Sequence, residues 1–309
     1  MRPALLAALL LAAIGAAGCG LGAGTGTGGV SLVVTRDFGD ARVGGARADR
    51  VPGSETVMRF LQRSFSVQTR YGGGFVQAIN GLAGKYGGGS RVDWFYYVNG
   101  IEADRGAAAF RLHRGDHVWW DRHDWSSAQR VPAVVGSYPE PFLHGREGRR
   151  LPTRIDCASA AAAACGLVAR SLRSAGVPAA QAALGTTSDP DTLRVVVGPW
   201  KAARSDPAAR QIEGGPIASG VYARFEAGGT RLVLLDAGGH PRGRYGAGAG
   251  LIAATRLADR APTWVVAGTD PAGTLAAARV FGQPGALTDR FALAAASGGV
   301  LRVPVGGGA

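Results

Sequence analysis

The residues with the clearest chemical capability are aromatic side chains on two segments, 93–98 and 116–122. Aromatic faces stack on flat ligands, turn amides add hydrogen bonds, and a histidine nitrogen can coordinate a metal. The residues predicted to bind are Trp94, Tyr96, Tyr97, Asn99, His117 and Trp119. This set predicts binding of a flat, amphipathic molecule, and His117 is the hypothetical axial ligand if that molecule carries a metal.

The aromatic residues of segment 93–98 divide between two faces, because a strand turns alternate side chains to opposite sides. Trp94 and Tyr96 share one face, and Tyr97 lies on the other. A sheet with a helix on one side needs only one apolar face. The second aromatic face is therefore either an exposed ligand surface or a surface covered by another part of the chain. The sequence leaves both readings open.

Several histidines and aspartates between residues 113 and 124 form a weaker candidate, for a metal site. On one strand His117 and His123 share a face, but six residues of strand separate them by ~20 Å. We predict no metal site and interpret these residues as solvated strand ends. The residues concerned are His113, Asp116, His117, Asp121, His123 and Asp124.

A catalytic set is not apparent, so we predict that the protein is not an enzyme. Ser219 lacks the Gly-x-Ser-x-Gly frame of a nucleophile elbow. The glycines of 246–250 resemble part of a nucleotide-binding run, and a glycine-rich helix entry can bind an anion. Asp270 precedes a proline and is interpreted as a helix N-cap. If the chain is an enzyme, its site is expected near these two features.

Residues 1–18 have the layout of an export signal. A basic start is followed by an unbroken apolar run over 4–14 and then by small residues. The run is shorter than the ~20 residues that a spanning helix needs. Cys19 directly after Ala-Gly resembles the bacterial lipobox, which implies a lipid on Cys19 and a protein anchored to the extracytoplasmic face of the membrane. The alternative is an ordinary secretory signal with an incidental cysteine.

Charge and cysteine content agree with export. The net charge of +12 favours contact with anionic lipid headgroups and wall polymers, whereas scattered arginines and export argue against nucleic acid. Cys157 and Cys165 are an even pair in an oxidising compartment, so a disulfide is predicted. Eight residues of one helix span ~12 Å, and bridged Cα atoms lie within ~7 Å. We therefore place Cys157 at the end of a strand and Cys165 in the following helix.

The elements that position the aromatic residues predict an α+β domain over residues 30–126. Two strands come first, a helix is expected over 55–65 with Ser54 as its N-cap, and further strands follow at 75–79, 93–98 and 116–122. This is the order of a β-grasp, in which one helix packs on a mixed sheet. Residues 19–29 precede this domain as a glycine-rich tether.

This first domain also carries a family resemblance. The turn Asn80-Gly81-Leu-Ala-Gly84, the spacing from Trp94 to Gly100 and the final strand led by Gly115-Asp116 are similar to the transcobalamin-like C-terminal domain of exported bacterial proteins. The resemblance covers about a third of the chain. It implies a surface for cobalamin or a related corrinoid. The helical barrel that completes the site in the animal carriers is not visible in residues 150–309.

The remaining sequence predicts a proline-rich linker over 127–152 and an α/β sandwich-type domain over 153–305. Helices are expected over 160–175, over 251–257 and after Asp270, with strands between them. The leading hypothesis is a lipoprotein that captures a small ligand and hands it to an uptake transporter, with no cofactor of its own. The alternatives are a structural or interaction protein of the cell envelope and an exported enzyme.

Overall fold

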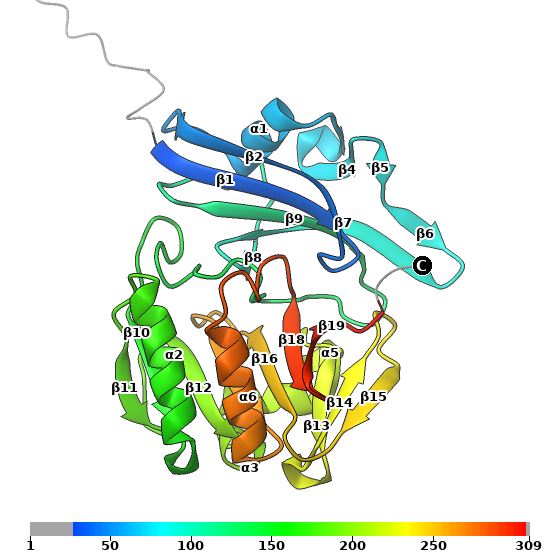
Figure 1. The fold of residues 1–309 in the computed structure, drawn as a ribbon. Helices are drawn as coiled ribbons and strands as arrows, with labels where there is room; N and C mark the ends of the chain where they lie inside the picture. Colours follow the sequence, from blue (N-terminus) through cyan, green and yellow to red (C-terminus); the bar gives the residue numbers. More distant parts are fainter. Residues whose placement is uncertain (1–26, 307–309) are drawn as a thin grey trace, which may run out of the picture.

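The computed structural model describes residues 27–306 (Figure 1). We call residues 27–126 the first domain, residues 153–306 the second domain, and 127–152 the connecting segment. The predicted export signal, the lipid on Cys19 and most of the predicted tether lie outside the described residues. Within 27–306, none of the helices has the length and apolar character needed to cross a membrane.

The first domain is built on a mixed sheet with the strand order β2-β1-β9-β7-β6, to which β8 is added beside β7. β1 and β9 run parallel, whereas β2 and β7 run antiparallel to their neighbours. A helix and a small second sheet lie over one face (Figure 1). The elements are β1 (Thr27–Arg36), β2 (Ala41–Val51), α1 (Val57–Ser64), β3 (Val67–Arg70), β4 (Phe75–Ile79), β5 (Leu82–Ala83), β6 (Lys85–Gly87), β7 (Ser90–Val98), β8 (Ile101–Glu102) and β9 (His117–Asp124).

Helix α1 forms because its apolar residues recur on one face and its start is capped. The Thr56 hydroxyl accepts a hydrogen bond from the Arg59 backbone N–H at 3.2 Å. The N-cap is therefore Thr56 and not Ser54, which lies two residues before it. The buried side chains are Val57, Met58, Phe60 and Leu61.

The second domain contains a seven-stranded sheet in the order β11-β10-β12-β17-β16-β18-β19. The first four strands are parallel, and the last three are antiparallel. The sheet consists of β10 (Thr153–Cys157), β11 (Ala180–Ala183), β12 (Leu193–Pro199), β16 (Gly250–Thr255), β17 (Thr263–Gly268), β18 (Ala292–Ala296) and β19 (Gly299–Val303).

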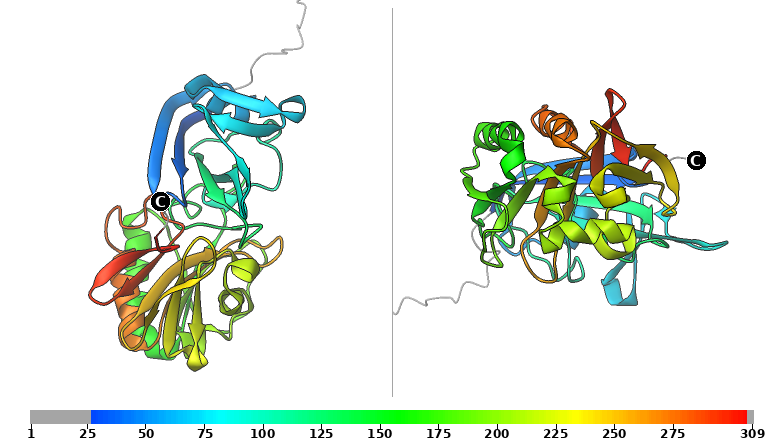
Figure 2. Two further views of the ribbon diagram at one scale, coloured as in Figure 1. Left: turned by 90° about the vertical axis from the view of Figure 1, so that its right-hand side faces the viewer. Right: turned by 90° about the horizontal axis from the view of Figure 1, so that it is seen from below.

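Helices cover one face of this sheet, and short helices with a three-stranded sheet cover the other (Figure 2). The first layer is α2 (Ala162–Ser174) and α6 (Pro271–Phe281). The second layer is α3 (Trp200–Ala203), α4 (Pro207–Arg210), α5 (Gly215–Ser219), β13 (Ala223–Glu226), β14 (Arg231–Leu235) and β15 (Pro241–Tyr245). The described residues also contain four short 3₁₀ helices: η1 (Tyr71–Gly73), η2 (Ser159–Ala161), η3 (Gln211–Gly214) and η4 (Ala227–Gly229). The predicted mixture of helices and sheets is confirmed.

The helix predicted over 251–257 is wrong, because residues 251–255 belong to β16, an interior strand of the sheet. A short apolar run fits a buried strand and a buried helix equally well by periodicity. Leu251 faces the α3–α5 side of the sheet, and Ile252 faces the α2–α6 side. Because both faces of β16 are buried, its sequence is apolar throughout and lacks the alternation of a half-exposed strand.

The connecting segment packs against both domains. Val134 belongs to the core that also holds residues of the first domain, whereas Val135 and Phe142 belong to the core beneath α2 and α6. All three side chains are fully buried. The segment thus joins the two domains through side-chain packing as well as through the chain.

Candidate functional site

The second aromatic face of the first domain is covered by the second domain. Tyr97 and Trp119 are fully buried, and the ring centroids of Trp119 and Phe291 lie 5.2 Å apart. The rings of Phe38 and Tyr222 meet at 4.9 Å in an edge-on contact. We call these five side chains, Phe38, Tyr97, Trp119, Tyr222 and Phe291, the aromatic seam. The sequence left open whether this second aromatic face is an exposed ligand surface or is covered by another part of the chain. In the structure it is covered.

The turn that carries Phe38 into the seam is held by a buried carboxylate. Asp121 accepts hydrogen bonds from the backbone N–H groups of Phe38, at 3.0 Å, and Gly39, at 2.8 Å. It also contacts Nδ1 of His123 at 2.8 Å. The imidazole of His123 is stacked between Phe38 and Phe95. These contacts place His123 within the domain interface and not at a solvated strand end.

Gly39 allows the two domains to approach each other at this turn. Its φ angle is +77°, and a Cβ atom would lie 2.2 Å from the carbonyl oxygen of Asp289 in the second domain. The same Cβ would lie 3.0 Å from the Trp119 ring. A side chain here would push the domains apart, so the glycine is required by close packing.

Trp94 and Tyr96 lie on the opposite face of the sheet, inside the core beneath α1. Nε1 of Trp94 donates to the carbonyl of Leu82 at 2.9 Å, and the Tyr96 hydroxyl donates to the carbonyl of Arg105 at 2.6 Å. Burial raises the pKa of Tyr96 above its usual range. Because the sheet separates these residues from Tyr97, the predicted aromatic set does not form one surface.

Asn99, in the turn after β7, is hydrogen-bonded to His117 at the start of β9. The Asn99 side chain accepts from the backbone N–H of His117 and donates to the carboxylate of Asp116, both at 2.9 Å. Nδ1 of His117 lies 2.9 Å from the Ser31 hydroxyl. Burial, together with nearby Arg42, lowers the pKa of His117 to about 4. Across residues 27–306, no group of three or more histidine, cysteine or acidic residues has the arrangement of a metal site.

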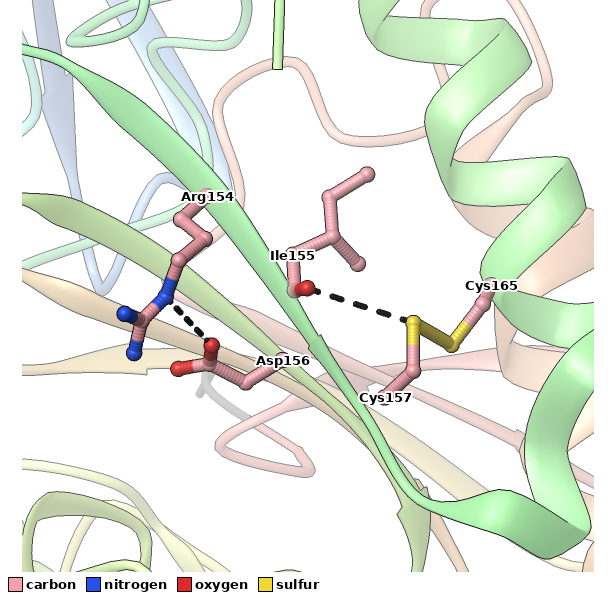
Figure 3. The surroundings of a disulfide bond; sticks show 5 residues. All are labelled: Arg154, Ile155, Asp156, Cys157 and Cys165. Carbon is pink, nitrogen blue, oxygen red and sulfur yellow. Dashed lines mark hydrogen bonds and ion pairs between the residues drawn. A yellow bond between two sulfur atoms is a disulfide. The ribbon is translucent and has the colours of Figure 1, made fainter. Parts of the chain in front are cut away.

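The predicted disulfide is confirmed. Cys157 ends β10, Cys165 lies in α2, and their Cα atoms are 6.1 Å apart (Figure 3). The neighbouring Asp156 is buried and contacts Arg154 at 2.6 Å and Arg194 at 3.3 Å. Burial raises the pKa of Asp156, and the arginines oppose that shift. The bridge and the ion pairs fix the end of β10 against the helix and the neighbouring strand.

In the glycine run 246–250, the Gly248 N–H is bound by the side chain of Asp270. One carboxylate oxygen of Asp270 caps α6 through the Gly273 N–H at 2.7 Å. The other oxygen accepts from the Gly248 N–H at 2.8 Å. Asp270 is therefore the predicted N-cap, and it takes the loop N–H group that an anion would need.

A smaller cavity of about 260 Å³ lies beside the start of β12. The Arg194 side chain reaches it, but this guanidinium contacts Asp206 at 2.5 Å and the Thr263 hydroxyl at 3.1 Å. Asp206 in turn caps α4. The charged groups of Arg194 and Asp206 are thus paired with each other.

A larger groove of about 620 Å³ lies at the boundary of the two domains. Its walls come from Asp104 and Ser126 of the first domain, from the connecting segment, from the end of α5 and from the loop between β16 and β17. We call it the interdomain groove. Its lining includes the charged residues and one small residue at which substitutions can be tested: Asp104, Arg130, Ala218, Arg256 and Asp259.

Arg256 is the deepest charged residue of the groove. Only 7 % of its surface is exposed. Nε donates to the carbonyl of Arg260 at 2.6 Å, and Nη2 donates to the carbonyl of Asp259 at 3.1 Å. Burial lowers its pKa. Both bonded acceptors are neutral, so the positive charge has no direct counter-charge among the described residues.

Arg130 occupies the outer part of the groove. Its side chain is 62 % exposed, and Nε contacts the buried carboxylate of Glu102 at 2.9 Å. Burial raises the pKa of Glu102, and the hydrogen bond from Arg130 opposes that shift. Sequence reasoning missed both arginines of the groove because each stands alone in the chain, without a motif around it.

The comparisons with known proteins concern the first domain. Residues 54–124 match the family described as Domain of unknown function (DUF4430). The match falls within the segment that resembles the transcobalamin-like domain, and the description assigns it no ligand. No curated protein matches the chain.

One solved structure, from Ruminococcus gnavus and described as a "putative metal binding protein", is 11% identical to this chain. The alignment covers 31% of this chain and 97% of that protein, with a TM-score of 0.24. This score is too low to relate the two folds, so the likeness carries no information about binding here.

Proposed function

We propose that this protein is an exported, membrane-anchored binding protein that holds a small ligand in the interdomain groove. Ligand sites occur preferentially at domain boundaries and enclose roughly 300–1,000 Å³. The groove of about 620 Å³ lies within that range. The observation that carries the proposal is this cavity, which stays open at a boundary where the neighbouring aromatic side chains are fully packed.

The aromatic seam gives the groove rigid walls. Trp119 and Phe291 hold the two domains in one arrangement, because their fully packed contact leaves no room for sliding. A preorganised site loses less entropy on binding than a mobile one. Tyr97 and Trp119, two of the aromatic residues first expected to stack on the ligand, thus act indirectly, by fixing the walls that contact it.

A corrinoid, the ligand that the family resemblance implies, is one candidate for the groove. The stacking surface of Trp94, Tyr96 and Trp119 is unavailable to a corrinoid, since all three rings are buried. A corrinoid would have to use the groove and its rim. Hydroxocobalamin is therefore the first named compound to titrate, followed by a library of small extracellular metabolites and nutrients.

The test uses the full chain and a variant that fills the groove. Ala218 is exposed and lines the groove, so Ala218→Trp should occupy it without disturbing a core. Ala163→Trp, on the exposed face of α2, is the matched control. We expect compounds that stabilise wild type and Ala163→Trp in thermal melts to bind Ala218→Trp at least tenfold more weakly. Equal binding by both variants would reject the groove as the site.

The membrane anchor is tested separately. Cys19→Ser should move the protein from the membrane fraction to the medium or the soluble envelope fraction if the lipobox prediction is right. Ligand binding by the groove should be the same in both forms, because the groove lies in residues 104–259. A partner transporter would be sought by crosslinking the anchored form in the presence of its ligand.

A further inference from the structure

The floor of the interdomain groove carries a buried guanidinium without a counter-ion. We propose, on the basis of the proposed function, that the ligand of the groove is a small anion whose carboxylate or phosphate group pairs with Arg256. A buried charge is costly unless it is paired and hydrogen-bonded. An incoming anion would supply the charge that the described part of the chain does not.

The hydrogen bonds of Arg256 leave part of its donor capacity unused. A guanidinium has five N–H donors in a planar fork. Nε and Nη2 bind two carbonyl oxygens of the same loop, those of Arg260 and Asp259. Nη1 donates no hydrogen bond to residues 27–306, and the side chain lines the groove. The two loop carbonyls therefore fix the orientation of the fork, and the free nitrogen is left for a ligand.

The acidic residues of the groove form no ion pair with Arg256, although the charges of Asp259 and Asp104 favour its charged form from a distance. Asp104 is engaged by Arg105 and Arg146, each at 2.9 Å. Asp259 is exposed at the rim, where water screens its charge. None of the carboxylates in residues 27–306 forms an ion pair with Arg256 within 4.0 Å.

A second arginine strengthens the preference for an anion. Arg130 lines the same groove, and its pairing with Glu102 uses Nε alone among its nitrogens. An anion bound to Arg256 would meet this second cation toward the opening. The planar guanidinium of arginine forms paired, charge-assisted hydrogen bonds with carboxylate and phosphate groups. A neutral ligand lacks the negative charge that strengthens these bonds.

The test compares charged and neutral probes of the same shape. Succinate and inorganic phosphate are titrated into the full chain at low salt, and succinamide serves as the uncharged counterpart of succinate. We expect the two anions to bind saturably in the millimolar range or tighter, and succinamide to bind at least tenfold more weakly. Binding of succinamide as tight as that of succinate, or binding of neither anion, would overturn the proposal.

The variants separate ligand pairing from a role in holding the loop. Arg256→Gln should weaken anion binding at least tenfold, and Arg231→Gln, an exposed arginine on β14, should leave it unchanged. If Arg256→Gln does not fold, Arg256→Lys keeps the charge but loses the fork, and should fold and bind several-fold more weakly. Unchanged anion affinity in a folded variant would show that Arg256 only shapes the loop, and would reject the inference.

The two proposals fail in different ways. A neutral compound that binds wild type and Arg256→Gln alike, and is lost in Ala218→Trp, would reject the anion and keep the groove. Anion binding that depends on Arg256 but is untouched in Ala218→Trp would place the anion outside the groove volume and reject the proposed function. Loss in both variants supports both.

Discussion

The two domains meet along a boundary with two unlike regions. In the aromatic seam, Trp119 and Phe291 are almost fully buried and pack edge to face. In the interdomain groove, a few residues away along the chain, the boundary is polar and an open volume of about 620 Å³ remains. Aromatic rings fill the seam, whereas the groove holds charged groups that need water or a ligand.

The contrast shows how the first domain contributes to a site whose walls come mostly from the rest of the chain, with Asp104 and Ser126 as its own lining residues. The first domain supplies the sheet whose outer face packs on the second domain. That contact fixes the position of the connecting segment, which forms one wall of the groove. Stability is therefore concentrated in the seam, and ligand specificity is expected in the groove.

The largest expected effect comes from opening the seam. Trp119→Ala removes a fully buried indole and should destabilise the chain by ~3–5 kcal/mol. Trp125→Ala is the control, because Trp125 lies outside the seam and contacts Arg91 in a cation–π pair; we expect ~1 kcal/mol or less there. Urea unfolding followed by circular dichroism measures both. A loss near that of the control would mean that the seam is not what holds the domains together.

A smaller effect is expected from the rim of the groove. Arg130→Met leaves the buried Glu102 carboxylate without its partner, so its already raised pKa should rise further. A carboxyl with a raised folded-state pKa favours the folded protein as the pH falls and it takes up its proton. We expect ~2 kcal/mol of destabilisation at pH 8 and clearly less at pH 5.

The double variant Glu102→Gln with Arg130→Met is the control for this effect. It removes the unpaired charge, so its stability should differ little between pH 8 and pH 5 relative to wild type. If Arg130→Met alone is destabilised equally at both pH values, packing of the arginine stem, and not the charge of Glu102, explains its contribution.

Much of the fold of each domain followed from local patterns, with β16 as an exception, but the site did not. The alternation along 93–98 predicted which rings share a face, and the spacing of Cys157 and Cys165 predicted the strand–helix bridge. Which layer covers the second face depends on contacts with Phe291, far along the chain. The groove brings Arg130 and Arg256 together only after folding, so no local signal marks either residue.

The smallest expected effect lies at the start of β9, on the face that also carries Trp119. The folded-state pKa of His117 is about 4, below the ~6.5 of an unfolded chain. Between these values the unfolded chain binds a proton that the folded protein does not, so stability present near pH 7 is lost as the pH falls toward 4. His117→Gln should lose ~1 kcal/mol less than wild type over this range, since partial exposure reduces the effect. His240→Gln, at a side chain that is 78% exposed, is the matched control. Parallel pH dependence in His117→Gln and wild type would show that this end of the sheet opens to water more than the rest of the boundary.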